Sequence, residues 1–404
     1  MGRMRGMGRT RPFTSCLSCL SCLSCLVVAA QPDDAAAHMR AAAQATRDHR
    51  LIDAVGELSA AVAIAPTLAP AWYALGQAYT DVSNEAANTF RDGAEDASWR
   101  RLLTADSLLA NGRMVDAFAL YRDALDRLPS MVSIHDSVAR IYERSGHADW
   151  ADRERSAAAI VPVDCTARRA LCDFRAGRTR ATLDATRDRS DAESRYWRAR
   201  AAGELARAAF TRLDDLPDSV ERRSARAARA RAEDRHLDAI AELEAALALA
   251  PGHPTLIYEL AAACFAARNY ERALATVAPL VRPPSNDARA LMLAGYSLVR
   301  LRRLEEAIPV LQRVLEGSGT DPAPRLALGR AYVLTGNYTA AIPLLEPQLA
   351  DDDDGSLHVQ LARAYAAVGQ RDKAAALSSA AVELQRAADR RASASAQRAI
   401  TAPR

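Results

Sequence analysis

The sequence contains almost no lysine, few aromatic residues and no runs of Val, Ile and Thr at a period of two. Of its 53 basic residues only Lys373 is a lysine, and aromatic residues make up 5% of the 404 positions. Alanine is abundant instead, and half of the chain is hydrophobic. Because alanine favours helices and strands need alternating β-branched residues, this composition predicts an all-α protein.

The sequence also has no large excess of positive or of negative charge. The basic residues, nearly all of them arginine, are balanced by 50 acidic residues, so the net charge predicts no nucleic-acid partner. One segment departs from this balance: residues 168–235 contain 18 arginines and 12 acidic residues, a surplus of about six positive charges. We interpret this segment as solvated helix faces, and a binding surface for an anionic polymer is the alternative.

Motifs of common enzyme sites are absent. The sequence has no GxSxG, no GK[ST] phosphate loop, no HExxH and, after residue 30, no CxxC pair with zinc spacing. The seven histidines are scattered singly, so each is expected at the surface and no metal site is predicted. Neither catalysis nor a cofactor is expected, and an enzyme with its site in the irregular middle of the chain is the alternative.

The first thirty residues have the layout of a secretory signal peptide. Four arginines without an acidic residue precede an apolar stretch, and Val28-Ala29-Ala30 fits a small-residue cleavage site. We therefore expect export to the periplasm or cell envelope. Residues 13–30 also reach the lower limit for a membrane span, so an uncleaved anchor is the alternative and the only membrane contact expected.

Three cysteines follow this segment: Cys165, Cys172 and Cys264. In an oxidising compartment Cys165 and Cys172 are a candidate disulfide. On one continuous helix their Cα atoms would lie about 10.5 Å apart, too far for a bridge. The bridge therefore requires Cys165 to precede the helix, and the sequence leaves the bridged and free forms equally open. Cys264 lies in an apolar pattern and is predicted to be buried.

Small residues recur at a constant spacing through most of the chain. Ala239, Ala273, Ala307 and Ala341 follow one another at intervals of 34 residues. The series continues with alanines at positions 54, 86, 117, 151, 206 and 374. The step from position 151 to position 206 is 55 residues, which exceeds one repeat.

This pattern resembles the tetratricopeptide repeat family, whose unit is a pair of helices. AWYALGQAY at residues 71–79 matches the first helix of the unit, and DAFALYRDALDRLP at 116–129 matches the second. The resemblance covers most of residues 38–386 and implies a right-handed superhelical α-solenoid of about ten helix-turn-helix repeats. Gly76 in a first helix, and the recurring alanines, each in a second helix, would lie where paired helices cross, with large side chains beside them.

The resemblance also suggests how the chain is divided. The predicted parts are a signal peptide at 1–30, an N-terminal array at 31–161, irregular linker repeats at 162–235, a C-terminal array at 236–386 and a disordered tail at 387–404. Within the irregular part, ARRALCDFRAGRTRATLDATR predicts a shortened helical pair, and Arg226 stands where the family has a core leucine. The solenoid is therefore expected to bend there.

The function implied by the resemblance is a non-catalytic scaffold that binds protein or peptide segments in a concave groove lined by the first helices. Arginine forks suit carboxylates and tyrosine rings suit apolar contacts. With one lysine, the chain cannot carry the lysine-based clamp of the family's chaperone-binding members. The residues at groove positions are Tyr73, Gln77, Asp136, Arg140, Arg144, Tyr258, Phe265, Arg289, Tyr296, Arg300, Arg330 and Arg363.

The cleavage site is testable by mass. In a bacterial cell that expresses the complete chain, the mature protein is expected in the periplasmic fraction with Gln31 as its first residue. Ala30→Arg places a large charged residue at the last position before the cut and should leave the precursor uncleaved. Intact-mass measurement distinguishes the products, and a full-length wild-type chain in the cytoplasm would contradict both export and anchoring.

Overall fold

The computed structural model describes residues 32–90, 93–128, 131–282, 287–317, 321–396 and 399–403. The elements of this part are twenty α-helices and one 3-10 helix, with no strand. The all-α prediction is therefore confirmed. The predicted signal peptide lies outside the described residues.

The helices fall into three groups along the chain. The first group is α2 (Pro32–Arg47), α3 (Leu51–Ile64) and α4 (Ala69–Asn88). The second is α5 (Ala94–Ala110), α6 (Met114–Arg127), α7 (Val132–Arg144), α8 (Ala148–Ile160), α9 (Arg169–Arg175), α10 (Thr179–Thr186) and α11 (Ala192–Asp214). The third is α12 (Val220–Ala232), α13 (His236–Leu249), α14 (Pro254–Ala266), α15 (Tyr270–Val281), α16 (Ala288–Arg300), α17 (Leu304–Gly317), α18 (Pro322–Thr335), α19 (Tyr338–Leu345), η1 (Glu346–Asp351), α20 (Ser356–Ala367) and α21 (Arg371–Ala396).

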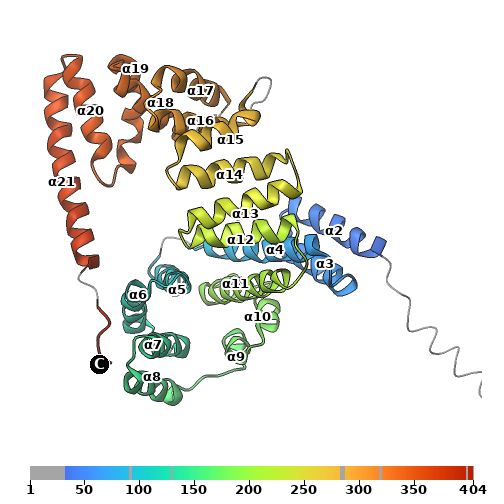
Figure 1. Cartoon of the computed structure of the whole chain (residues 1–404). Helices are drawn as coiled ribbons and strands as arrows, with labels where there is room; N and C mark the ends of the chain where they lie inside the picture. The colour runs from blue at the N-terminus through green and yellow to red at the C-terminus, as the bar shows by residue number, and fades with distance from the viewer. Residues whose placement is uncertain are drawn as a thin grey trace, which may run out of the picture.

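The third group is a regular succession of helical pairs in which each helix packs on the next (Figure 1). The turn between α18 and α19 shows why the sequence folds this way. Gly336 ends α18 with φ of 79°, which glycine adopts without strain, and the side chain of Asn337 then accepts a hydrogen bond from the Ala340 amide at the start of α19.

Glycines set the distance between the helices of a pair. A Cβ added to Gly295 of α16 would lie 2.5 Å from Leu311 of α17, and one added to Gly329 of α18 would lie 2.5 Å from Leu345 of α19. Each glycine therefore admits a leucine of the next helix into the crossing. This is the packing role that the repeat pattern predicted for its small residues.

The same contact at Gly76 uses a helix that is remote in the sequence. A Cβ on Gly76 of α4 would lie 2.6 Å from the ring of Phe210 in α11. Leu75 and Tyr79 share a buried cluster with Ala206 and Ala209 of α11, and the Ser83 hydroxyl donates to the Ala199 carbonyl, 116 residues away, at 2.9 Å. The helical partner of α4 is thus α11, and α5 to α10 are inserted within this pair.

The inserted helices form a ring that returns to its starting point (Figure 1). The pairs α5/α6, α7/α8 and α9/α10 follow one another, and α9 and α10 then pack against α11. Leu183 of α10 joins the buried cluster of α3 and α4, and Arg180 donates to the Tyr79 hydroxyl at 2.9 Å. Both ends of the insertion are therefore held by the α4/α11 pair.

One expectation about the first half is corrected by this arrangement. The predicted second helix around Ala86 is wrong, because α4 continues to Asn88 and buries Ala86 in its final turns. Within residues 31–161, the predicted N-terminal array, the inserted helices begin after α4 and separate it from its partner α11. The shortened pair expected in the middle segment is present as α9 and α10, and Arg226 forms an ion pair with Asp214 at 2.8 Å in place of a core contact.

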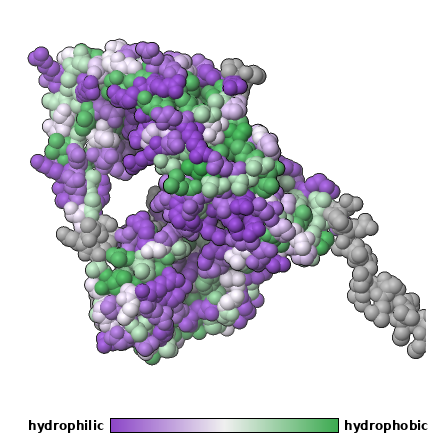
Figure 2. Space-filling model, in the orientation of Figure 1, coloured by the Kyte–Doolittle hydropathy of each residue, from purple (hydrophilic) through white to green (hydrophobic). Residues whose placement is uncertain are grey.

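The first part of the tail continues the last helix. Helix α21 extends to Ala396, so residues 387–396 are helical. Beyond it, Ile400 packs against the core of the inserted helices, and the Tyr142 hydroxyl donates to the Thr401 carbonyl at 2.7 Å. Figure 2 shows an opening between the C-terminal helices and the inserted helices.

The α4/α11 contact can be tested with paired glycine substitutions. Gly76→Ala should lower the free energy of unfolding by about 1–3 kcal/mol, because the new methyl group collides with Phe210. Gly203→Ala is the matched control on α11: its Cβ meets only the Ser83 hydroxyl at 3.8 Å, so the better helix propensity should make this variant neutral or more stable. Urea denaturation measures both changes.

A double-mutant cycle assigns the collision to its partner. In a Phe210→Ala background, Gly76→Ala should cost much less than in the wild type, since the ring is gone. An unchanged cost in that background would show that α4 does not pack on α11 at this point.

Candidate binding site

The predicted groove residues line separate hollows. The hollow with Arg140 and Arg144 is set apart because α4 pairs with α11, so the inserted helices are not stacked in line with the C-terminal array. The first hollow contains Tyr73 and Gln77, and the second contains Arg140 and Arg144. The third contains Arg363, and the fourth contains Tyr258, Arg289 and Tyr296.

The fourth hollow combines aromatic and cationic side chains from neighbouring repeats. Its volume is about 370 Å³, and it lies between α14, α16 and the start of α18. The guanidinium of Arg289 lies 4.9 Å from the ring centre of Tyr258, within the range of a cation–π interaction. Burial raises the pKa of Tyr296, with Arg330 nearby opposing this change. Tyr296 therefore stays a neutral hydrogen-bonding phenol at physiological pH.

Three more predicted residues lie beside this hollow. The ring of Phe265 is 6.4 Å from Tyr296 and 5.2 Å from Tyr270. Arg300 donates to the Tyr270 hydroxyl at 3.1 Å and lies over that ring. Arg330 is exposed on α18. Together with the fourth hollow these residues form one surface, which we call the C-terminal surface: Tyr258, Phe265, Arg289, Tyr296, Arg300 and Arg330.

The remaining predicted residues have other surroundings. Asp136 is paired with Arg175 at 3.1 Å. Tyr73 and Gln77 share their hollow with Arg231 and Glu259, which pair with each other. This hollow lies between α4, α12 and α14, next to the C-terminal surface, whereas Asp136 is on α7 in the inserted ring.

A buried charged cluster that the sequence did not predict joins α5, α6 and α11. Asp106 accepts hydrogen bonds from the hydroxyls of Tyr121 at 2.5 Å and Tyr196 at 2.8 Å, and Arg200 lies 3.4 Å from the same carboxylate. The Arg200 guanidinium also lies over the ring of Phe174 at 4.6 Å. No motif marks this cluster, because its members come from three helices whose packing the sequence pattern did not specify.

Burial and the Asp106 charge control the protonation of this cluster. Burial raises the pKa of Tyr121 and of Tyr196, and the neighbouring carboxylate adds to both shifts. Burial by itself would lower the pKa of Arg200. Tyr196 and Asp106 outweigh this effect and raise the pKa of Arg200 above its ordinary value. Arg200 and Asp106 are therefore a charged pair held between two neutral phenols.

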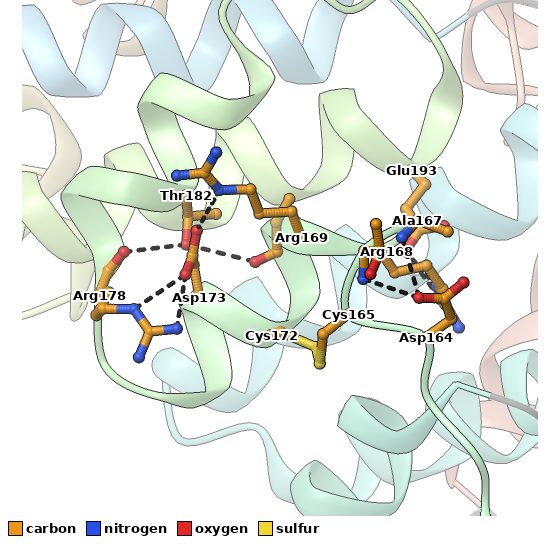
Figure 3. Close-up of a disulfide and its surroundings, with 12 residues drawn as sticks. Asp164, Cys165, Ala167, Arg168, Arg169, Cys172, Asp173, Arg178, Thr182 and Glu193 are labelled. Atoms are coloured by element: carbon orange, nitrogen blue, oxygen red, sulfur yellow. Dashed lines mark hydrogen bonds and ion pairs between the residues drawn. A yellow bond between two sulfur atoms is a disulfide. The ribbon is translucent and has the colours of Figure 1, made fainter.

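The two middle cysteines are bridged (Figure 3). Cys165 lies in the turn before α9 and Cys172 on that helix, and their Cα atoms are 5.7 Å apart. The chain thus folds back at Cys165. This is the condition that the seven-residue spacing set for a bridge, because Cys165 has to precede the helix. Beside it, Arg168 pairs with Glu193 at 2.8 Å, which links this turn to α11. Cys264 is buried in α14 as predicted.

Most of the arginine-rich segment is neutralised internally. Fifteen of its eighteen arginines lie within ion-pair distance of a carboxylate. Arg178, for example, pairs with the buried Asp173 at 2.7 Å. The segment therefore offers less free positive charge than its composition indicates.

One histidine is buried, and its neighbour is a carboxylate. His135 is buried and lies 2.7 Å from Glu154, so the expectation that every histidine is at the surface is wrong for this residue. Among the described residues no three or more His, Cys, Asp or Glu side chains form a group that could hold a metal ion. None of the helices in the described ranges combines the length and the apolar character needed to span a membrane.

Comparison with known proteins identifies the repeats. Residues 230–295 and 298–358 match a family model described as tetratricopeptide repeat. These segments correspond to α12 through the start of α20, the most regular part of the array. No curated protein matches the chain significantly.

Solved structures similar to this chain include two tetratricopeptide repeat proteins, TTC0263 and YrrB. MamA from Desulfovibrio magneticus RS-1 is 19% identical over 42% of this chain and 97% of its own, with a TM-score of 0.39. TTC0263 from Thermus thermophilus is 24% identical over 41% of this chain and 91% of its own, with a TM-score of 0.33. YrrB is 21% identical over 44% of this chain and 92% of its own, with a TM-score of 0.38.

The buried cluster predicts a large cost for removing its carboxylate. Asp106→Asn should lower the free energy of unfolding by about 3–5 kcal/mol, because Arg200 would remain buried without its counter-charge. Asp123→Asn is the control: this residue pairs with Arg101 at the surface, where each side chain is 42% exposed, and its loss should cost at most about 1 kcal/mol. Equal effects in urea denaturation would contradict the role of Asp106.

The raised tyrosine pKa values predict a loss of stability at high pH. In the unfolded chain these phenols ionise near pH 10, whereas in the folded protein Tyr121 and Tyr196 keep their protons. The folded state therefore binds more protons above pH 10, and stability falls as the pH rises from there. Tyr121→Phe removes one such group, so its stability should fall less steeply between pH 10 and pH 11 in urea titrations.

Proposed function

We propose that the protein, whose residues 230–295 and 298–358 match the tetratricopeptide repeat family, is a non-catalytic scaffold that binds an extended segment of a partner protein. The binding site is the C-terminal surface. The observation that carries the proposal is the grouping of Tyr258, Arg289 and Tyr296 around one hollow from two successive repeats.

The chemistry of this surface suits a peptide. Tyrosine rings offer large contact areas with little conformational freedom to lose, and Tyr258 and Tyr296 are half-buried and so already positioned. Arg289 and Arg330 are exposed cations that can bind carboxylates with two parallel hydrogen bonds. The preferred segment therefore carries an apolar or aromatic residue next to an acidic one.

The scaffold is proposed to act in the periplasm or cell envelope. Support comes from the signal-like residues 1–30 and from the bridge between Cys165 and Cys172, since disulfides persist mainly in oxidising compartments.

Site-specific photo-crosslinking tests the proposal. A photoreactive amino acid at Tyr258 or Tyr296 of the exported protein should capture the same partner band. The same group at Leu237, an exposed residue on α13 outside the hollows, should not capture it. Equal capture from Leu237, or none from either tyrosine position, would overturn the proposal.

The contribution of the cation is measured in a second step. In the chain labelled at Tyr296, Arg289→Ala should lower the crosslinking yield roughly fivefold to thirtyfold, the range for truncating a central interface arginine. Arg371→Ala removes an exposed arginine from α21 and is the matched control, with an unchanged yield expected.

A further inference from the structure

The hollow that contains Arg140 and Arg144 lies outside the C-terminal array, among helices that do not form a groove of stacked repeats. Its volume is about 400 Å³, and α4, α5, α7 and α11 surround it. It exists because the inserted ring closes back on the α4/α11 pair, so that α7 and α11 line the same space (Figure 1). Its charged lining consists of Arg140 and Arg144 from α7, Arg200, Glu204 and Arg207 from α11, and Asp106 from α5.

Two of the four arginines have carboxylate partners within the cavity. Arg200 pairs with Asp106 at 3.4 Å, and Arg207 pairs with Glu204 at 2.6 Å. Arg140 donates to the Ser137 hydroxyl at 3.0 Å and has no carboxylate partner in the described part of the chain. Arg144 forms no ion pair with any described residue. The lining therefore carries two uncompensated positive charges.

The two uncompensated arginines are arranged to act together. They are four residues apart on α7, so their side chains leave the same helix face about 5–6 Å apart. Opposite them, Arg200 is fixed by Asp106 and by the Tyr196 hydroxyl at 3.0 Å. Three guanidinium groups thus surround one space, and one of them is held rigidly by buried partners, which lowers the entropy cost of binding an anion.

We propose that this cavity binds a small organic oxyanion with two or more negative charges. Arg140 and Arg144 neutralise the anion with bidentate hydrogen bonds, and Arg200 positions the opposite end. A volume of about 400 Å³ is typical of small-molecule sites, and helices on four sides leave less room for an extended segment than the C-terminal surface does. Carboxylate and phosphate groups share this recognition chemistry.

Isothermal titration of the mature full-length chain tests the site with two probes, citrate and inorganic phosphate, at constant ionic strength. One saturable site is expected. Arg140→Gln and Arg144→Gln should each weaken binding at least about tenfold, because each removes a charge-assisted fork. Arg371→Gln, remote from the cavity, should bind like the wild type. Far-UV circular dichroism of each variant without ligand verifies that the fold is intact.

Arg144→Lys separates charge from geometry. Lysine keeps the positive charge but loses the planar fork, so its affinity should fall between those of the wild type and Arg144→Gln. Tighter binding of citrate would assign carboxylate ligands, and tighter binding of phosphate would assign phosphate esters.

Two outcomes would overturn the proposal: no saturable binding of either probe, or equal binding by the wild type and the Arg140→Gln and Arg144→Gln variants. The crosslinking positions at Tyr258 and Tyr296 lie on another part of the molecule. Failure of one proposal therefore leaves the other intact.

Discussion

The close crossing of α4 and α11 is the contact on which the arrangement of the whole first half depends. Gly76 lets the ring of Phe210 approach to a distance that any side chain at position 76 would prevent. This crossing fixes both ends of the inserted ring and places α12 next to α4. The C-terminal array therefore begins from a helix pair whose two members are separated in the sequence by the entire ring.

The ring has a different kind of interior from the array. In the regular pairs the contacts are leucine against glycine and alanine, whereas Asp106, Arg200 and two buried phenols meet where the ring packs on α11. A buried charge is tolerated only when its partners are complete, and here the carboxylate is satisfied by groups from three helices. The polar interior that results is where a cavity with surplus positive charge can form, while the array presents tyrosines and arginines at its surface. One molecule thus carries two surfaces of different chemistry.

The repeat pattern predicted local pairing well because local pairing depends on short-range spacing. Gly295 and Leu311, or Gly329 and Leu345, lie in successive helices, so a constant period places them together. The same pattern predicted a second helix around Ala86, but α4 continues through this residue to Asn88. The repeat period does not show whether a first helix ends or continues. Composition was likewise a poor guide to surface charge, because ion pairs such as Arg178 with Asp173 depend on folded neighbours.

The sequence by itself determined the helical class, the repeat unit, the shortened middle pair and the geometric condition for the Cys165–Cys172 bridge, because each follows from residue type and spacing along one or two helices. Only the tertiary structure decided which helix completes the repeat that α4 begins, and hence where Arg140 and Arg144 lie relative to Arg200. Those positions depend on contacts such as that of Ser83 with Ala199, 116 residues apart. A periodic pattern carries no information about which distant helix will meet a given face; the fit of side chains such as Gly76 and Phe210 selects it.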